Sequence, residues 1–440
     1  MNIDNKKITF LFLYEHLKLG GIEKTIIDQI RVYSCKGIRI VWLRYGRPED
    51  IYEPWKQVIN ECNLEIIDVN IKKKKWLDKK KLIFSPNEIV YAIAYEPFDF
   101  VRLEELANEY LNEIKLFYQV PHFEGRVNYL EEYYSSYSKR KKIKSQLAII
   151  YRRWYENGNI IFFSYKHIEE MSKRYNINCL NRKDLVFQTP IEPEPFDEQL
   201  AYERAKREEF RIITCGRFEF PHKGYMFGLI DSYCKLKKNY PQIKLDIIGY
   251  GVCERQIRSY VDKLSPEYSK DIVFRGAVSP EKIKHYFNKS HMNVSVAYSL
   301  LDGAKTGLVS LPARHYTYDC EVYGYLSDEI GNYLDNREGE AVDKYIEDLI
   351  NMEPDEYILL CKKSYQYALN NLEYDPNWLF KKNNLYNNYY SRGEVRYFKR
   401  IEKHHVLKAW LYKNLYNISR ELGVYKWLKN VKNKLSKENK

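Results

Sequence analysis

Short apolar runs alternate with helical patterns along most of this chain, and this alternation restricts the possible folds more than any other feature. The runs are rich in branched and aromatic side chains, which is typical of buried parallel strands. In the first half they are residues 8–14, 38–43, 65–69, 89–94, 114–118 and 159–163, and in the second half residues 210–215, 243–248, 272–275 and 292–296. Helical patterns over residues 23–33, 223–239, 254–263 and 280–288 separate several of them. The alternation predicts an α/β protein built on doubly wound parallel sheets.

A proline-rich stretch divides the alternation into two halves. Three prolines stand within residues 190–195, where neither a helix nor a central strand can continue. We therefore predict an N-terminal Rossmann-like domain over residues 1–190, a linker over 191–209 and a second Rossmann-like domain over 210–375. Two such domains would leave a cleft for a ligand between them.

The positive charge of the chain is concentrated in three segments. With 72 Lys and Arg against 60 Asp and Glu, the 440 residues carry a formal net charge of +12. Residues 72–81, 139–153 and 395–440 carry +6, +7 and +10, so the rest of the chain carries −11. Nucleic-acid binding fits this distribution poorly, because the basic segments match no reader module and the remainder is acidic.

The third basic segment, a helical tail over residues 395–440, also has an amphipathic pattern. Apolar residues recur in it every three or four positions, and Trp410 and Trp427 lie close to them. These residues are Leu407, Leu411, Leu415, Ile418, Leu422, Tyr425, Leu428, Val431 and Leu435. A basic amphipathic helix with tryptophan is typical of a helix that lies on an anionic membrane surface. A helix docked on the protein itself is the alternative.

The sequence contains neither a membrane-spanning run nor a signal-peptide core. No segment approaches the ~18 apolar residues that a spanning helix needs. The eight cysteines are scattered without a C-x-x-C pair, so we expect buried apolar thiols and no zinc site. These features predict a cytoplasmic protein.

Glycine clusters follow the strands of the second half. They are Cys215-Gly216-Arg217, Lys223-Gly224, Gly249-Tyr250-Gly251, Phe274-Arg275-Gly276 and residues 299–308. Open α/β sheets bind ligands at the carboxyl ends of their strands, and glycine lets the backbone approach a phosphate closely. Arg217 and Lys223 would add full positive charges. This combination predicts a site for a diphosphate whose negative charge grows as it departs.

In order and spacing these motifs resemble those of family 4 glycosyltransferases, which belong to glycosyl transferases group 1 and have the GT-B fold. The shared pattern starts at Gly20-Gly21-Ile22-Glu23-Lys24, similar to the family's GG-x-E-[KR], and continues to about residue 380. The resemblance implies two Rossmann-like domains that face a central cleft, and a helix over residues 376–394 that returns to the first domain. No D-x-D occurs in the sequence, which is consistent with a GT-B enzyme that uses protein cations in place of a metal ion.

The resemblance also implies roles for individual residues. Arg217 and Lys223 would bind the donor diphosphate and stabilise the leaving nucleotide, and Asp302 would lie near the donor sugar hydroxyls. The other donor-binding candidates are Gly20, Gly21, Gly216, Gly249, Gly251, Ser299, Gly303, Lys305, Thr306, Gly307 and Leu308. Among these, the glycines of the first domain would lie beside the transferred sugar or the diphosphate, and those of the G-x-G motif would border the base and ribose. The amides of Gly307 and Leu308 would face the phosphates.

Two acceptor-binding candidates follow a strand of the first half. The segment of residues 117–122 is similar to the family segment whose histidine reaches the acceptor and the transferred sugar. His122 is therefore a catalytic candidate that would hydrogen-bond a sugar hydroxyl or share the acceptor proton. Arg126 stands one helical turn further along. A buried structural histidine is the alternative for His122.

The chain departs from the family at the second acid of its E-x7-E motif. Eight residues after Asp302 stands Ser310, and a different alignment places Pro312 at this position. Neither side chain accepts hydrogen bonds from ribose hydroxyls as a carboxylate does. Either Glu321 or Asp319 takes this place, or the affinity for the nucleotide is reduced, or the protein is a non-catalytic relative.

The resemblance implies a retaining, metal-independent glycosyltransferase without a cofactor. Its co-substrate would be a nucleotide diphosphate sugar, a UDP-sugar in the first place, and its acceptor a glycan or a polyprenyl-linked lipid. The setting would be the synthesis of bacterial capsule, surface polysaccharide or cell-wall glycan, peripherally on the inner face of the cell membrane. Oligomers with itself or with other glycosyltransferases would fit that setting. The alternative is a non-catalytic GT-B subunit that binds glycan or a partner glycosyltransferase.

Overall fold

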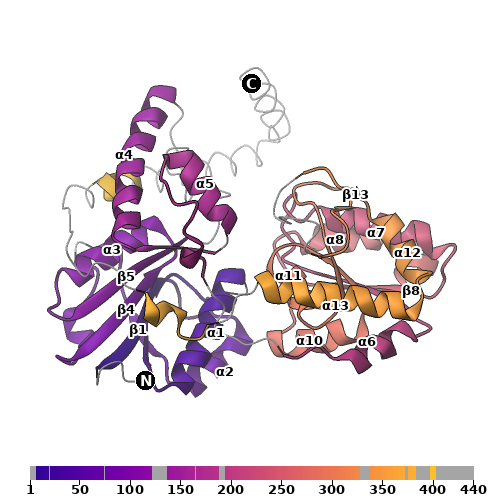
Figure 1. Cartoon of the computed structure of the whole chain (residues 1–440), viewed down its shortest axis with the longest axis horizontal. Helices are drawn as coiled ribbons and strands as arrows, with labels where there is room; N and C mark the ends of the chain where they lie inside the picture. Colours follow the sequence, from indigo (N-terminus) through magenta and orange to yellow (C-terminus); the bar gives the residue numbers. More distant parts are fainter. Residues whose placement is uncertain are drawn as a thin grey trace. The chain divides into compact units, whose positions relative to one another are not determined.

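The computed structural model divides the chain into two compact units (Figure 1). The first comprises residues 1–187 and 376–440, and the second comprises residues 188–375. The structure describes residues 6–18, 20–73, 75–120, 136–163, 165–187, 194–327, 337–371, 375–382 and 397–402.

The first unit is built on a parallel sheet of six strands. The strands are β1 (Lys7–Tyr14), β2 (Arg39–Arg44), β3 (Glu65–Asp68), β4 (Glu88–Ala94), β5 (Glu113–Val120) and β6 (Ile160–Phe162). Their order is β3-β2-β1-β4-β5-β6, so the chain reverses its direction of growth between β1 and β4. This order is that of a doubly wound dinucleotide-binding fold, in which ligands bind outside the carboxyl ends at the reversal.

Helices cover both faces of this sheet. On one face lie α1 (Gly21–Cys35) and α2 (Glu53–Glu61), and on the other lie α3 (Pro97–Ala107), α4 (Tyr137–Glu156) and α5 (Tyr165–Tyr175) (Figure 1). The side chains of β1 alternate between the two cores: Phe10 and Phe12 pack toward α1 and α2, and Leu11 toward α3. All three are fully buried, which explains why the strand reads as an uninterrupted apolar run. Two 3-10 turns, η1 (Lys79–Lys81) and η3 (Lys183–Leu185), also belong to this part of the unit.

The chain returns to the first unit after the second unit is complete. The 3-10 turn η5 (Trp378–Lys381) buries Trp378 and Phe380 in the core under α1, where Phe380 lies against Tyr91. The helical residues 397–402 pack on the opposite face, where the ring of Phe398 stacks on Trp154 at 5.6 Å. The expected return helix over residues 376–394 is thus a short turn at its start, and residues 383–396 lie outside the described residues.

The second unit contains a parallel sheet of five strands. These are β7 (Phe210–Cys215), β8 (Ile243–Ile248), β9 (Ile272–Gly276), β10 (Met292–Ser295) and β11 (Val309–Pro312), in the order β11-β10-β7-β8-β9. Its helices are α6 (Glu198–Ala205), α7 (Tyr225–Lys237), α8 (Glu254–Val261), α9 (Pro266–Ser269), α10 (Pro280–Lys289), α11 (Tyr298–Ala304), α12 (Val342–Ile350) and α13 (Pro354–Asn371). A short antiparallel pair joins β12 (Glu321–Val322) to β13 (Glu340–Ala341).

One expectation about local structure was wrong. The range expected to be linker, residues 191–209, contains α6, which packs on α13 within the second unit. The glycine cluster over residues 299–308, to which the sequence assigned no element, is mostly the helix α11. The basic tail falls almost entirely outside the described residues, because only residues 397–402 of it are described. Within the described part of the chain, no helix is both long and apolar enough to cross a membrane.

Candidate functional site

Backbone hydrogen bonds hold the ends of three strands together in the second unit. The amide of Gly216, just after β7, donates to the carbonyl of Ile248 at 3.0 Å, and the amide of Gly249, just after β8, donates to Gly276 at 2.9 Å. Two residues after Gly216, the amide of Phe218 donates to the carbonyl of Tyr250 at 2.9 Å. The glycine clusters that end β7, β8 and β9 therefore lie side by side at the carboxyl edge of the sheet.

Glycine is required at both positions of the G-x-G motif because the neighbouring backbone leaves no space. A Cβ on Gly249 would lie 1.9 Å from the carbonyl oxygen of Gly216, and Gly249 has a φ of +153°. A Cβ on Gly251 would lie 2.6 Å from the carbonyl oxygen of Phe218. The motif thus first serves to bring two loops together, and this close packing leaves bare backbone at the edge where a ligand would lie.

Lys223 lies against Gly216. A Cβ on Gly216 would lie 3.0 Å from Cδ of Lys223 and 3.3 Å from its Nζ, so a side chain there would displace the lysine. Burial, assisted by the charge of Arg217, lowers the pKa of Lys223 from 10.5 to about 8. A cation that is short of solvation gains stability when an anion reaches it, and this position therefore suits a phosphate group.

Arg217 stands beside this lysine with a different environment. Its side chain is 60% exposed, and the guanidinium is 3.9 Å from the carboxylate of Glu219. An ion pair at that separation and exposure is weak. The arginine is therefore available to bind a ligand at the same strand end.

Asp302 faces the same strand end from α11. Burial raises the pKa of the Cys215 thiol, the carboxylate of Asp302 raises it further and Lys223 lowers it, so both charges lie near the end of β7. Asp302 is also paired with Lys305, one helical turn further along α11, at 2.6 Å. The structure thus brings Asp302, Lys223 and Lys305 to one edge of the sheet.

The missing second acid has a structural explanation. Ser310 and Pro312 both lie inside the buried strand β11, where neither side chain can reach a ligand. Glu321 is paired with Arg314 at 2.7 Å, and this pairing lowers the pKa of Glu321. Asp319 is exposed on the connection after β11. Two carboxylates at the family's spacing therefore do not occur around Asp302.

The amides expected to face phosphate are engaged within the protein. Gly307 donates to the carbonyl of Ala304 at 2.9 Å, and Leu308 donates to Gly303 at 3.3 Å, as at the end of an ordinary helix. Gly307 has a φ of +67°, and a Cβ on it would lie 2.7 Å from the ring of Phe196. The turn that ends α11 explains why glycine stands at position 307. The amides of Gly307 and Leu308 both donate within the protein, so neither is open for the expected contact with phosphate.

The other candidates in α11 also have structural contacts. The side-chain amide of Asn293 donates to the carbonyl of Ser299 at 2.9 Å, and a Cβ on Gly303 would lie 2.5 Å from the same amide nitrogen. The hydroxyl of Thr306 donates to the carbonyl of Gly303 at 2.7 Å. Glycine at 303 therefore lets α11 lie close to β10.

Sequence reasoning missed a buried arginine that holds this region. Arg204 of α6 has no exposed surface, and its guanidinium donates to the carbonyls of Gly307 at 2.8 Å and Phe287 at 3.3 Å. Its partners are thus carbonyls at the ends of α11 and α10, where the helix dipole is negative. His291 continues the network: its Nε2 is 2.9 Å from the carbonyl of Arg204, and its Nδ1 accepts from the amide of Arg211 at 3.0 Å.

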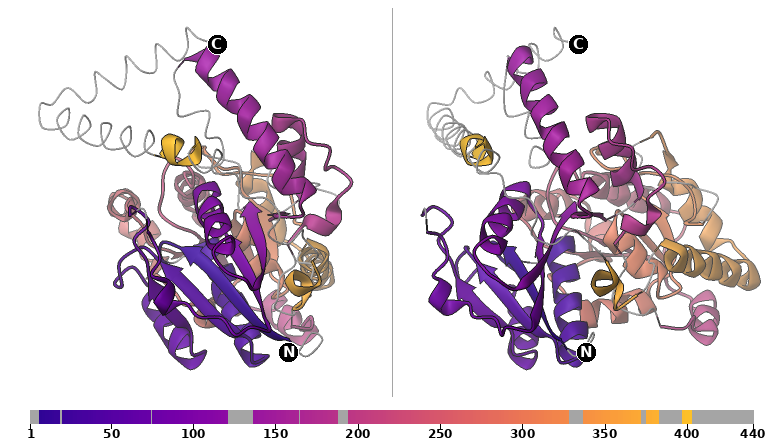
Figure 2. Two further views of the ribbon diagram at one scale, coloured as in Figure 1. Left: turned by 90° about the vertical axis from the view of Figure 1, so that its left-hand side faces the viewer. Right: turned by 60° about the vertical axis from the view of Figure 1, so that its left-hand side comes forward.

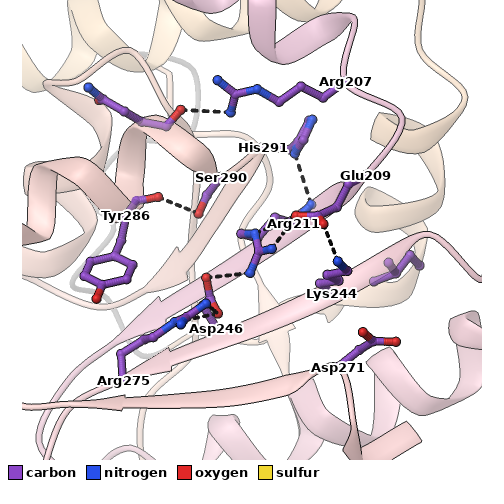
Figure 3. A network of polar contacts seen from close by, with 12 residues as sticks. Arg207, Glu209, Arg211, Lys244, Asp246, Asp271, Arg275, Tyr286, Ser290 and His291 are labelled. Atoms are coloured by element: carbon purple, nitrogen blue, oxygen red, sulfur yellow. Dashed lines mark hydrogen bonds and ion pairs between the residues drawn. The ribbon is translucent and has the colours of Figure 1, made fainter. Parts of the chain in front are cut away.

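Figure 3 shows the charged groups on this side of the sheet. Asp246 in β8 is 1% exposed and pairs with Arg211 of β7 and Arg275 of β9, both at 2.9 Å (Figure 3). Glu209 binds Arg211 and Lys244. The three strands are therefore linked by side chains as well as by backbone hydrogen bonds.

A second group of residues that sequence reasoning missed packs beside the loop that carries Lys223. The amide of Tyr316, at a φ of +60°, donates to the carbonyl of His222 at 3.1 Å, and the two rings lie 4.8 Å apart. The ring centroids of His315 and His222 are 6.0 Å apart. Because His222 precedes Lys223 in the chain, this packing fixes the position of the lysine from the side of β11.

In the first unit, the glycine pair lies between β1 and α1. A Cβ on Gly20 would lie 2.2 Å from Glu23 Oε2, and α1 begins at Gly21. The hydroxyl of Tyr14 donates to Glu23 at 3.2 Å, and His16 is 3.6 Å from the same carboxylate. His16 after β1 and Glu23 in the first turn of α1 thus bring an imidazole and an acid together at the end of β1. His122 and Arg126 lie outside the described residues.

Similarity to known proteins was found by comparing structures and not by comparing sequences. No family model matches the sequence, and no curated protein matches it. A glycosyltransferase from Rickettsia africae has 13% sequence identity and a TM-score of 0.51, with 90% of this chain and 99% of that chain covered. A mutant of S. aureus TarM, in complex with fondaparinux, α-GlcNAc-glycerol and UDP, has 9% identity and the same TM-score, with 85% and 98% covered. At these identities the likeness shows the fold, and the chain has the GT-B fold of two Rossmann-like domains.

Proposed function

We propose that this protein is a retaining, metal-independent glycosyltransferase. It moves a sugar from a nucleotide diphosphate sugar, a UDP-sugar in the first place, to a glycan or lipid-linked acceptor. The setting is the synthesis of bacterial surface polysaccharide or cell-wall glycan. The resemblance to family 4 glycosyltransferases and the GT-B fold support this proposal.

The observation that carries the proposal is the position of Lys223 against Gly216. The lysine is desolvated, Arg217 stands beside it exposed to solvent, and the glycines after β8 leave backbone bare at the same edge. A departing nucleoside diphosphate gains negative charge, and two preorganised cations stabilise that charge more in the transition state than in the ground state. The two cations would take the part that a metal ion has elsewhere.

The remaining candidates have supporting roles in the proposal. Asp302 accepts hydrogen bonds from hydroxyls of the donor, and its pairing with Lys305 holds its carboxylate in place. The first unit binds the acceptor, with His122 and Arg126 as its candidate contacts. Glu23 and His16 at the glycine loop are further candidates, because they stand at the carboxyl end of β1.

The test is a donor screen with the full-length protein. Nucleotide sugars that differ in base and sugar are incubated with the enzyme, and release of the nucleoside diphosphate is measured. We expect turnover of one donor class, with kcat/KM reduced roughly 100-fold or more by Lys223→Met and by Arg217→Ala. The control is Lys263→Ala, which removes an exposed cation at the end of α8. If no donor binds and neither variant changes any property, the protein is not this enzyme.

A non-catalytic GT-B subunit remains the second candidate. Asp302 is already paired with Lys305, and Ser310 is buried where the family has its second acid. Calorimetry with the nucleotide and with glycan fragments separates the two candidates. Glycan binding without any nucleotide binding would favour the subunit.

A further inference from the structure

Glu23 holds a carboxylate at the carboxyl end of β1, where the strand order of the first sheet reverses. It stands in the first turn of α1, which packs along β1 (Figure 2). Its side chain is only 10% exposed and accepts a hydrogen bond from the hydroxyl of Tyr14 at 3.2 Å. Burial and the charge of Glu23 raise the pKa of Tyr14, so this phenol stays protonated and remains a donor. A Cβ on Gly20 would clash with the same carboxylate, so glycine leaves the space that Glu23 occupies.

The two ring nitrogens of His16 have different surroundings. Nδ1 is buried, lies 3.6 Å from Oε1 of Glu23, and has no hydrogen-bond partner among the described residues. The side chain as a whole is 26% exposed. Nε2 is neither buried nor bound by a described residue, so the open part of the ring includes Nε2. A buried structural histidine hydrogen-bonds both nitrogens as a rule. His16 instead has its inner nitrogen beside a carboxylate and its outer nitrogen open to a ligand.

Contacts within the protein hold His16 in place independently of any ligand. The next residue, Leu17, donates its amide to the carbonyl of Asp50 at 3.2 Å, and its own carbonyl accepts from the amide of Tyr52 at 2.8 Å. The ring of Tyr14 meets the imidazole edge-on, with the two ring centroids 5.8 Å apart. These contacts fix the position of the imidazole in advance, which a proton-transfer group requires.

Glu23 is the acid at the inner nitrogen, although Asp50 also stands near the imidazole. Asp50 is paired with Lys18 at 2.9 Å, and the pKa of Asp50 is lowered mainly by that lysine, with a smaller effect from His16. A carboxylate at Nδ1 holds the ring proton there and stabilises the imidazolium that forms when Nε2 takes up a proton. The 3.6 Å between Glu23 and Nδ1 is longer than a hydrogen bond, as is common for catalytic pairs before the substrate binds.

We propose that His16 is the general base of sugar transfer and that Glu23 is the positioning residue that holds its ring. The proposal rests on the proposed function and assigns to His16 the acceptor proton for which the sequence suggested His122. Nε2 takes the proton of an acceptor hydroxyl while the hydroxyl oxygen uses its electron pair to form a bond to the anomeric carbon. The bond from that carbon to the diphosphate oxygen breaks, and its electron pair leaves with the nucleoside diphosphate. The imidazolium then releases its proton to solvent.

The test uses the full-length protein with the donor that the screen identifies. His16→Gln should lower kcat for transfer to a hydroxyl acceptor roughly 100-fold, and Glu23→Gln about tenfold or more. The KM for the donor should stay within about twofold of wild type in both variants, because neither side chain binds the diphosphate. Asp50→Asn is the matched control: it removes an acid near the imidazole but not the one at Nδ1, so kcat should stay within about threefold of wild type.

Azide distinguishes a base from a structural group. This anion attacks without losing a proton, so His16→Gln should form the glycosyl azide within about threefold of the wild-type rate. Equal losses of transfer to azide and to the hydroxyl acceptor would overturn the proposal in favour of a structural role. Transfer to the hydroxyl at the wild-type rate by His16→Gln would also overturn it, and a loss confined to His122→Gln would assign the proton to that histidine.

The position of the ring proton gives a readout that needs no turnover. In protein labelled with ¹⁵N-histidine, NMR should place the proton of neutral His16 on Nδ1, and Glu23→Gln should move it toward Nε2. The signal that is missing from His16→Gln identifies the residue. A proton on Nε2 in the wild type would overturn the pairing with Glu23. A wild type that turns over no donor would refute the proposed function and this role together, whereas a wild type that transfers sugar no better than His16→Gln would refute this role alone.

Discussion

Replacing Lys223 by Met is expected to stabilise the unliganded protein while abolishing donor binding. Methionine keeps the length of the side chain beside Gly216 and removes the charge. The pKa of Lys223 is lowered from 10.5 to about 8, and each tenfold change in proton affinity is worth about 1.4 kcal/mol. The charged lysine therefore destabilises the folded protein by about 3 kcal/mol at pH 7.

The pH dependence has a definite sign. Between pH 8 and 10.5 the folded lysine has lost its proton while the unfolded one retains it, so the wild type gains stability as the pH rises through this window. The advantage of Lys223→Met in free energy of unfolding should therefore fall from about 3 kcal/mol at pH 7 to about 1.5 kcal/mol at pH 9.5. Urea denaturation at the two pH values measures this difference, and binding of UDP is measured by calorimetry.

Two results would refute the reasoning. If Lys223→Met is less stable than wild type at pH 7, the lysine is not desolvated in the folded protein. If the advantage of the variant does not change with pH, the pKa of the lysine is not lowered. Loss of UDP binding together with higher stability would show that the cation is kept at the expense of stability for the ligand.

Three further predictions concern the structural groups around the site. Gly249→Ala should lower the free energy of unfolding, measured by urea denaturation, by roughly 3 kcal/mol, because its Cβ would lie 1.9 Å from a backbone carbonyl oxygen. Gly276→Ala is the control: its Cβ would stand in open space at a φ of +69°, so it should lower the free energy of unfolding by only about 1 kcal/mol. Equal losses for the two variants would contradict the steric explanation. Arg204→Met leaves buried carbonyls without hydrogen-bond donors, so it should destabilise the protein by about 3 kcal/mol or more. The matched change at the more exposed Arg207, Arg207→Met, should cost less than about 1 kcal/mol. Calorimetric unfolding of the two variants measures this difference. Burial lowers the pKa of His291 to about 4, so as the pH falls the unfolded chain takes up a proton before the folded protein does. Between pH 6.5 and pH 4 the free energy of unfolding of the wild type should therefore fall by up to about 3 kcal/mol relative to that of His291→Gln. A difference in unfolding free energy that stays constant over this range would exclude the effect.

The strands were predictable because buried parallel strands are apolar on both sides. Every run expected to be a strand is one in the structure, within two residues at each end. The helix α6 was not predictable in the same way, since its buried residues are Ala201 and Arg204, and a buried arginine gives no apolar periodicity. The helix α11 is short and contains Gly303, which is needed for the close approach to Asn293 and looks like a loop residue in the sequence.

The site was partly predictable for a related reason. The cluster of Lys223 with the strand-end glycines follows from the order of strands, because parallel strands end at one edge. The role of Gly307 was misjudged, since a glycine that ends a helix and a glycine that cradles phosphate look alike in sequence. The packing of His222 against Tyr316 depends on the connection after β11. A contact between segments that are distant in sequence leaves no local pattern from which it could be predicted.

The return of the chain to the first unit has a consequence for how the protein is made. Residues 376–382 complete the core on one face of the first sheet, and residues 397–402 complete the core on the other. The second unit is continuous in sequence, so it can fold as soon as residue 375 leaves the ribosome. The first unit emerges earlier but is finished later, because Trp378, Phe380 and Phe398 are made only after the whole second unit. A fragment that ends at residue 187 would therefore expose two apolar patches, and the first unit depends for its solubility on a segment that is translated after the second unit.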